Sequence, residues 1–200
     1  IEVLISSLDG TIYCLNGKTG EVEWSFIRNR IIPCSPALGD VDGDGEIEII
    51  VGSYDRKVYW LNGKTGKIEW SYMLYGYPIS SFALGDIDGD GEIEIIVGSY
   101  DRKVYCLNGK LGDLDWFFET GDMVLSSPVL GDVDKDGKIE IIVGSFDRKV
   151  YCLTGTGEKW AIPGPWPMRG GCAMHGSNAT DHDADLLPDM LEISTDTGLN

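Results

Sequence analysis

Residues 51–70 read VGSYDRKVYWLNGKTGKIEW, and residues 97–116 read VGSYDRKVYCLNGKLGDLDW, which is nearly the same sequence 46 residues later. A third copy, VGSFDRKVYCLTGTGEKW, runs over residues 143–160 and is two residues shorter in its last turn. The opening of the chain carries the unit once more over residues 5–24, as ISSLDGTIYCLNGKTGEVEW. Repetition at a fixed period of this length indicates an array of similar structural units.

A second shared block precedes each full copy. It reads SPALGDVDGDGEIEII from Ser35, SFALGDIDGDGEIEII from Ser81 and SPVLGDVDKDGKIEII from Ser127. Each 46-residue unit therefore divides into four short β-type runs separated by Gly, Asp and Asn turns. For the unit that starts at Ser35 we expect strands over 36–41, 47–54, 57–61 and 67–73, and alternation with a period of two is visible in the third.

Four short strands in each repeat predict an all-β fold, a β-propeller built from four-stranded antiparallel blades. About four blades are visible in residues 1–162, and the first holds only its last three strands. The following residues, 163–180, are rich in Gly and Pro and predict a closure segment, and residues 181–200 form a separate acidic element. We expect the blades at about 1–27, 34–75, 80–121 and 126–162.

The incomplete first blade leaves three arrangements open. Residues 166–180 could supply its missing strand, the chain could be part of a larger propeller, or a neighbouring molecule could supply the strand. The first residues, IEVLISS, have no basic leader region and no small-residue cleavage site, and they already predict a strand. This start is typical of the interior of a longer or processed polypeptide.

The composition excludes some classes of partner. The chain has 33 acidic against 16 basic residues and a formal net charge of −17, so it lacks the basic surface that nucleic-acid binding and anionic lipid surfaces require. No run of residues approaches the ~20 apolar residues of a membrane-spanning helix. We therefore expect neither nucleic-acid binding nor membrane insertion.

The loop between the first two strands of each blade carries a repeated pattern of carboxylates, D-x-D-x-D-G-x-x-E. Positions 1, 3, 5 and 9 offer hard oxygen donors, the glycine at position 6 permits a sharp turn, and position 7 offers a backbone carbonyl, a combination that favours calcium. Without a cation, two carboxylates ~4 Å apart repel by about 4 kcal/mol at an effective dielectric constant of about 20. The predicted ligand positions 1, 3, 5, 7 and 9 are Asp40, Asp42, Asp44, Glu46 and Glu48; Asp86, Asp88, Asp90, Glu92 and Glu94; and Asp132, Asp134, Asp136, Lys138 and Glu140.

These loops are not EF-hands. Position 12, where an EF-hand has a bidentate glutamate, is Val51, Val97 or Val143 and lies in a β-branched run, so strands flank the loops. The third loop also carries two lysines, Lys135 and Lys138. We therefore expect its calcium site to be the weakest.

At this point the sequence resembles known repeat families. The block GDVDGDGEIEIIVGS, residues 39–53, resembles the FG-GAP/VCBS repeat of integrin-type β-propellers, although Glu48 stands where that family has Asp. The block IYCLNGKTGEVEW, residues 12–24, is similar to the PQQ-like propeller repeat, in which a Trp ends the blade. The resemblance covers about residues 1–162, and it implies a β-propeller whose loops bind calcium.

The C-terminal acidic element has a fuller set of EF-like ligand positions. Position 6 is Leu186 instead of glycine, which departs from the EF-hand pattern. The element resembles thrombospondin type 3 and dockerin-like calcium motifs, and the alternatives are a degenerate fifth blade loop or a disordered acidic tail. Its positions 1, 3, 5, 7, 9 and 12 are Asp181, Asp183, Asp185, Leu187, Asp189 and Glu192.

Aromatic residues suggest both packing and binding. A row of tryptophans recurs at one repeat position, and periodic large apolar residues favour packing between blades over a ligand platform. Tyr72, Tyr75 and Tyr77, with Met73 and Leu74, form a cluster that does not repeat, and this is the candidate loop for a binding face. The repeated tryptophans are Trp24, Trp70, Trp116 and Trp160.

Cysteines and one sequon complete the candidate chemistry. Cys14, Cys106 and Cys152 occupy one repeat position, too far apart for disulfides, so we expect buried thiols. Cys34 and Cys172 lie outside that set, and a disulfide between them stays open. The sequon at Asn178 could carry a glycan.

The sequence predicts a calcium-binding β-propeller, extracellular or at the cell surface because calcium is plentiful there, which acts as a non-catalytic binding, adhesion or structural module. Its protein or glycan ligand stays unidentified. No nucleophile, zinc or phosphate motif occurs, and both histidines lie outside the repeats, so we expect no enzyme activity. The alternatives are a self-assembling subunit of a surface filament or layer, and a fragment of a PQQ-type dehydrogenase or calcium-dependent polysaccharide lyase.

Overall fold

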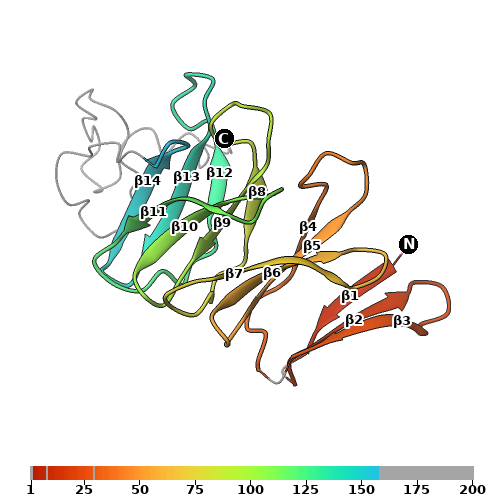
Figure 1. The fold of residues 1–200 in the computed structure, drawn as a ribbon. Helices are drawn as coiled ribbons and strands as arrows, with labels where there is room; N and C mark the ends of the chain where they lie inside the picture. Colours follow the sequence, from red (N-terminus) through yellow and green to blue (C-terminus); the bar gives the residue numbers. More distant parts are fainter. Residues whose placement is uncertain (1, 8, 29, 158–200) are drawn as a thin grey trace, which may run out of the picture.

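The computed structural model describes residues 2–7, 9–28 and 30–157 of the chain. Within these residues the regular structure consists of fourteen β-strands, which form four antiparallel sheets. Figure 1 shows the sheets following one another in chain order along an arc, with the N-terminal sheet at one end. The predicted all-β fold of antiparallel, propeller-type blades is therefore confirmed.

The strand order within each sheet is the order of the chain, so every connection inside a sheet is a hairpin. The second and third sheets have four strands each, and three strands are described in each of the first and fourth. The first sheet contains β1 (Glu2–Ser6), β2 (Thr11–Asn16) and β3 (Val22–Ile27); the second β4 (Ala37–Gly39), β5 (Glu48–Ser53), β6 (Lys57–Asn62) and β7 (Ile68–Met73); the third β8 (Ala83–Gly85), β9 (Glu94–Gly98), β10 (Lys103–Asn108) and β11 (Leu114–Glu119); and the fourth β12 (Val129–Gly131), β13 (Glu140–Ser145) and β14 (Lys149–Thr154).

The first strand of the second sheet is shorter than the sequence predicts. The expected strand over 36–41 is reduced to β4, Ala37–Gly39. Asp40 ends it because its carboxylate accepts hydrogen bonds from the backbone amides of Gly43 and Gly45, which turns the chain into a loop. The loop therefore begins as soon as the first carboxylate is reached.

Apolar residues on both faces of the middle strands hold the sheets together. In β5, Ile49 and Val51 pack against the first sheet in a cluster with Ile12 and Phe26. The alternate residue, Ile50, belongs to a different cluster, which the third sheet completes. Because successive side chains of a strand point to opposite faces, a continuous apolar run is buried only when a neighbouring sheet covers each face.

The repeated tryptophans join each sheet to the next. The indole Nε1–H of Trp24, Trp70 and Trp116 donates to the carbonyl oxygen of Gly63, Gly109 and Gly155 respectively, at 3.0 Å in each case. Each acceptor lies 39 residues further along the chain, in the last turn of the following blade. The predicted packing role of these three tryptophans is confirmed, and Trp160 lies outside the described residues.

The cysteines at the repeated position are buried, as predicted. Cys14, Cys106 and Cys152 each expose 5% or less of their surface. Cys34 is also buried, and this burial raises the pKa of its thiol to about 11. The open question of a disulfide between Cys34 and Cys172 falls outside the described residues, as do the closure segment 163–180 and Asn178. Among the described residues there is no helix long and apolar enough to cross a membrane.

The tryptophan contact gives a matched test of blade stacking. Gly112 has φ +73° and a Cβ there would lie 2.4 Å from the Trp70 ring, whereas Gly20, with φ +74°, has open space around the same position. Both Gly→Ala changes place a side chain in the left-handed region, at a cost of ~1–2 kcal/mol. Gly112→Ala also displaces the indole, which adds about 1–3 kcal/mol. Urea denaturation should show the larger loss for Gly112→Ala, and equal losses would contradict the stacking role.

Candidate metal centres in the blade loops

The three acidic loops lie at equivalent positions in successive sheets. They connect β4 to β5, β8 to β9 and β12 to β13. Figure 1 shows all three projecting at the same side of the molecule, at the top of the view. The three loops that the sequence predicts as calcium sites therefore lie on one side of the molecule, one each in the second, third and fourth sheets.

Backbone amides hold the carboxylates in place. In the first loop Asp40 accepts from Gly43 at 2.8 Å and from Gly45 at 3.0 Å, while Asp42 accepts from Asp44 and Asp44 accepts from Glu46. The second loop repeats all four bonds 46 residues later. Each aspartate is thus fixed at one oxygen or both, which orders the loop around its acidic side chains.

The side-chain oxygens converge as the spacing predicts. In the second loop, oxygens of Asp86, Asp88 and Asp90 lie within 4.8 Å of one another. The equivalent three aspartates converge within the same distance in the third loop. In the first loop the converging set combines two aspartates with the position-9 glutamate. The sets are Asp40, Asp42 and Glu48; Asp86, Asp88 and Asp90; and Asp132, Asp134 and Asp136.

In the first two loops the side chain at position 7 is bound by another residue and is not directed at the candidate metal site. Glu46 forms an ion pair with Lys64, and Glu92 accepts a hydrogen bond from the side-chain amide of Asn108 at 3.0 Å. Lys138, at the same position of the third loop, is a cation. Only the backbone carbonyl at this position has the chemistry of a calcium ligand in all three loops.

The glutamate at position 9 is buried beneath each loop. Glu48, Glu94 and Glu140 expose 2%, 4% and 3% of their surface, although each is a carboxylic acid. Each accepts the backbone amide of loop position 2 through Oε2, at 2.9 to 3.0 Å. These glutamates begin β5, β9 and β13, so each loop is tied directly to a buried strand.

Burial shifts the ionisation of these glutamates. Loss of water raises the pKa of Glu48, Glu94 and Glu140, and the nearby loop aspartates raise it further. For Glu94 the pKa rises to about 7. A negative charge at this position is therefore unfavourable unless a cation or a proton neutralises it.

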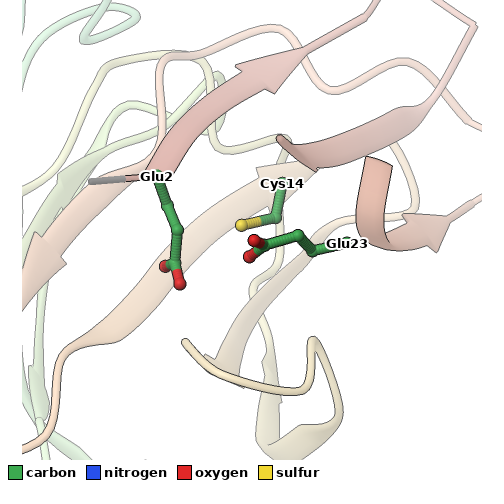
Figure 2. A group of neighbouring side chains, drawn as sticks. All are labelled: Glu2, Cys14 and Glu23. Carbon is green, nitrogen blue, oxygen red and sulfur yellow. The ribbon is translucent and has the colours of Figure 1, made fainter. Parts of the chain in front are cut away.

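A further acidic group lies in the first sheet. Figure 2 shows Cys14 of β2 with Glu2 of β1 and Glu23 of β3 beside it, and ligand atoms of the three lie within 4.8 Å of one another. Burial raises the pKa of the Cys14 thiol, and both glutamates add to the effect. Glu2 stands 46 residues before Glu48, so it occupies loop position 9 of the first blade.

The third sheet has the same arrangement behind its loop. The Cys106 thiol donates to Asp115 Oδ2 at 3.9 Å. The pKa of Asp115 is raised by burial and by the charges of Asp88 and Asp90. Sequence reasoning missed Glu2, Glu23 and Asp115 as members of these clusters. The available signal was the 46-residue spacing, which gives Glu2 the position of Glu48. The same spacing places an acidic residue directly before Trp24, Trp70 and Trp116.

The third loop departs from the other two in backbone as well as charge. Position 4 is Gly43 with φ 78° in the first loop and Gly89 with φ 85° in the second, but Lys135 with φ 63° in the third. A side chain in the left-handed region is strained, and this one adds a positive charge to the loop. The weaker calcium site expected there stays a prediction. The C-terminal acidic element lies outside the described residues, and with it its predicted ligand positions Asp181, Asp183, Asp185, Leu187, Asp189 and Glu192.

The raised pKa values predict that the metal-free protein loses stability as pH rises. In the folded state Glu94 keeps its proton up to about pH 7, whereas the unfolded chain releases it near pH 4.5. The free energy of unfolding therefore falls between about pH 5 and 7.5, because the folded state binds the additional proton in this range. Urea denaturation of protein stripped of divalent ions should show this fall, and Glu94→Gln should flatten it. Stability that rises with pH over this range would contradict the assignment.

Comparisons with known proteins agree with the fold. A sequence comparison with curated proteins finds no match. The crystal structure of BamB from Moraxella catarrhalis is similar with a TM-score of 0.60 and 18% identity, over 78% of this chain and 43% of that one. BBS1N, in a lead-soaked complex with ARL6DN, is similar with a TM-score of 0.57 and 16% identity, over 78% and 45%. The chain thus spans less than half of either structure, and these likenesses concern the fold alone.

A protein-family comparison covers all of the described residues. The sequence pattern of the lambda-carrageenase β-propeller domain matches residues 1–65 and 63–163. These two matches include the three loops and the four sheets described above. The chain therefore belongs to the lambda-carrageenase β-propeller domain family.

Proposed function

We propose that this chain is a calcium-binding β-propeller that acts as a non-catalytic binding module. The observation that carries the proposal is the repeated convergence of loop carboxylates above a buried glutamate. The candidate donors in the loops are oxygen atoms, without imidazole or thiol, and such sets suit calcium and other hard cations. The likeness of the loop sequence to calcium-binding FG-GAP repeats supports the same choice.

Calcium would act here as a structural ion. It would offset the repulsion among the loop carboxylates and the cost of ionising Glu48, Glu94 and Glu140. An ion that binds only the folded state stabilises that state by mass action. Extracellular modules use calcium sites with dissociation constants of about 10⁻⁴ to 10⁻³ M, a range that fits an extracellular or cell-surface protein.

Calcium titration tests this proposal. Calcium at ~100 times its dissociation constant should raise the melting temperature by roughly 5–10 °C for each site. Asp88→Asn should abolish calcium binding in the second loop, because it removes one negative ligand. The loop itself should keep its conformation, because the amide oxygen of the new side chain can still accept the hydrogen bond from the Asp90 backbone amide. Glu21→Gln removes one charge from an exposed turn and is the matched control. An unchanged melt in calcium, or equal titrations of Asp88→Asn and wild type, would refute the proposal.

The family match favours a second candidate, a polysaccharide-cleaving enzyme. A lambda-carrageenase acts on lambda-carrageenan, and this chain matches the propeller domain of that family. The non-catalytic proposal predicts that purified protein releases no new reducing ends from lambda-carrageenan, with or without calcium. A steady release that stops in heat-denatured protein would overturn the non-catalytic role while leaving calcium binding intact.

A further inference from the structure

The first sheet has one apolar face that no other described sheet covers. Val3 and Ile5 of β1 stand 46 residues before Ile49 and Val51 of β5, in the same register with the neighbouring strand. Val3 exposes 43% of its surface and Ile5 47%, whereas Ile49 and Val51 expose 1% and 0%. The later pair is buried because the first sheet packs against it. Among the described sheets, none does the same for Val3 and Ile5.

The turn beside this face lacks a second contact that the later sheets have. In each later sheet, the turn after β6, β10 or β14 packs against the Trp ring of the preceding sheet. A Cβ at Gly66, Gly112 or Gly157 would lie 2.4 to 2.6 Å from that ring. Gly20, at the same repeat position of the first sheet, is exposed, and a Cβ there would meet no atom within 4 Å among the described residues. The first sheet therefore leaves both contacts of a sheet junction uncovered.

The fourth sheet carries the complementary face at the other end of the arc. In the third sheet, Ile96 and Val104 belong to the cluster that packs against the fourth sheet, and both are fully buried. The fourth sheet repeats them 46 residues later as Ile142 and Val150, which are only half-buried. The surface that covers one sheet is thus present again, with no further sheet packed on it in the described part of the chain.

The two uncovered faces fit the pattern of an existing junction. The face of the fourth sheet that receives the third has the same four residue types as the uncovered face of the first sheet, with one Ile and one Val exchanged. Exchanges that conserve volume are well tolerated in packed contacts. These residues are Ile141, Val143, Tyr151 and Leu153 in the fourth sheet, and Val3, Ile5, Tyr13 and Leu15 in the first.

A second copy of the chain is the occupant that supplies both faces. Figure 1 shows the first and fourth sheets at opposite ends of the arc, with the second and third sheets between them, so the two faces of one chain do not meet. Covering apolar side chains is favourable, and an uncovered apolar face is typical of an interaction surface. The chain covers only 43% and 45% of the two similar structures, so the fold has room for further sheets beyond the arc.

We propose that copies of this chain associate head to tail, with the fourth sheet of one copy packed on the first sheet of the next. Ile142 and Val150 of one copy then contact Val3 and Ile5 of the other. Such a heterologous contact gives a closed ring or a longer series, and both contain the same junction. The proposal goes beyond the binding role inferred above and does not depend on calcium, because no loop carboxylate lies in either face.

Analytical ultracentrifugation of the folded, calcium-loaded chain tests this contact. At high salt, which screens the repulsion between chains of net charge −17, the average mass should rise with protein concentration. Ile5→Lys should weaken association at least tenfold, because it places a charge in an apolar contact. Ile68→Lys is the matched control, since Ile68 is 42% exposed and lies in β7 of the second sheet. This control should associate like wild type.

Mixing two variants distinguishes a head-to-tail contact from a symmetric one. Val150→Lys alters the fourth sheet and leaves the first sheet intact, whereas Ile5→Lys does the reverse. Each variant alone should be monomeric, and an equimolar mixture should form a one-to-one complex through the two intact faces. If Val150→Lys associates by itself as strongly as wild type, the fourth sheet is not part of the contact and the proposal is wrong.

Because Val150 is half-buried, thermal denaturation has to show that each variant keeps its fold. Hydrogen exchange of the wild-type chain gives a test without substitution: a higher concentration should increase protection in β1 and β14 and leave β7 unchanged. A chain that stays monomeric up to about 1 mM would refute the second copy as occupant and leave residues 158–200 of the same chain as the alternative. Equal losses of association in Ile5→Lys and Ile68→Lys would also overturn the proposal.

Discussion

Burial of the second strand on both faces is the constraint on which the rest of this fold depends. Every residue of β5 and β9 is buried, and alternate residues pack against the preceding and the following sheet. A sheet with a neighbour on one side only would leave the other of these faces in water, so a blade needs neighbours on both sides. The hydrogen bond from each Trp to the next blade then fixes how far adjacent sheets are offset.

This constraint also determines the electrostatics of the acidic loops. Glu48 and Glu94 are the first residues of the fully buried strands, so stacking of the sheets places their carboxylates out of water. The loop aspartates lie directly above and add like charge. A cation in the loop would therefore stabilise the start of a core strand as well as the loop, which would couple ion binding to the stability of the blade.

The repeat made much of this structure predictable. Strand positions, the propeller architecture, the packing of the tryptophans and the grouping of loop aspartates all follow from a pattern that each copy carries within itself. The predicted binding loop of Tyr72, Tyr75 and Tyr77 with Met73 and Leu74 shows where this reasoning fails. Leu74 is 2% exposed and Tyr72 packs against the core, whereas Tyr75 and Tyr77 line a pocket beside the β5–β6 and β9–β10 turns. The pocket combines residues from separate copies, and their approach in space is not encoded in any one repeat.

The repeat copies keep the same side chains at one end of the strands and vary them at the other, and this difference has a physical basis. On the pocket side the backbone is the same in each copy, because Tyr54, Tyr100 and Phe146 all donate their amide to the carbonyl of the segment before the blade. The residues that supply this carbonyl are Ile31, Tyr77 and Met123, so the backbone interaction leaves the side chain free to vary. On the loop side the side chains themselves make the contacts that order the chain, and a change of residue changes the loop. The end with fixed chemistry therefore suits a small ion that each blade would bind in the same way, whereas the end with variable side chains suits a larger ligand that meets several blades at once.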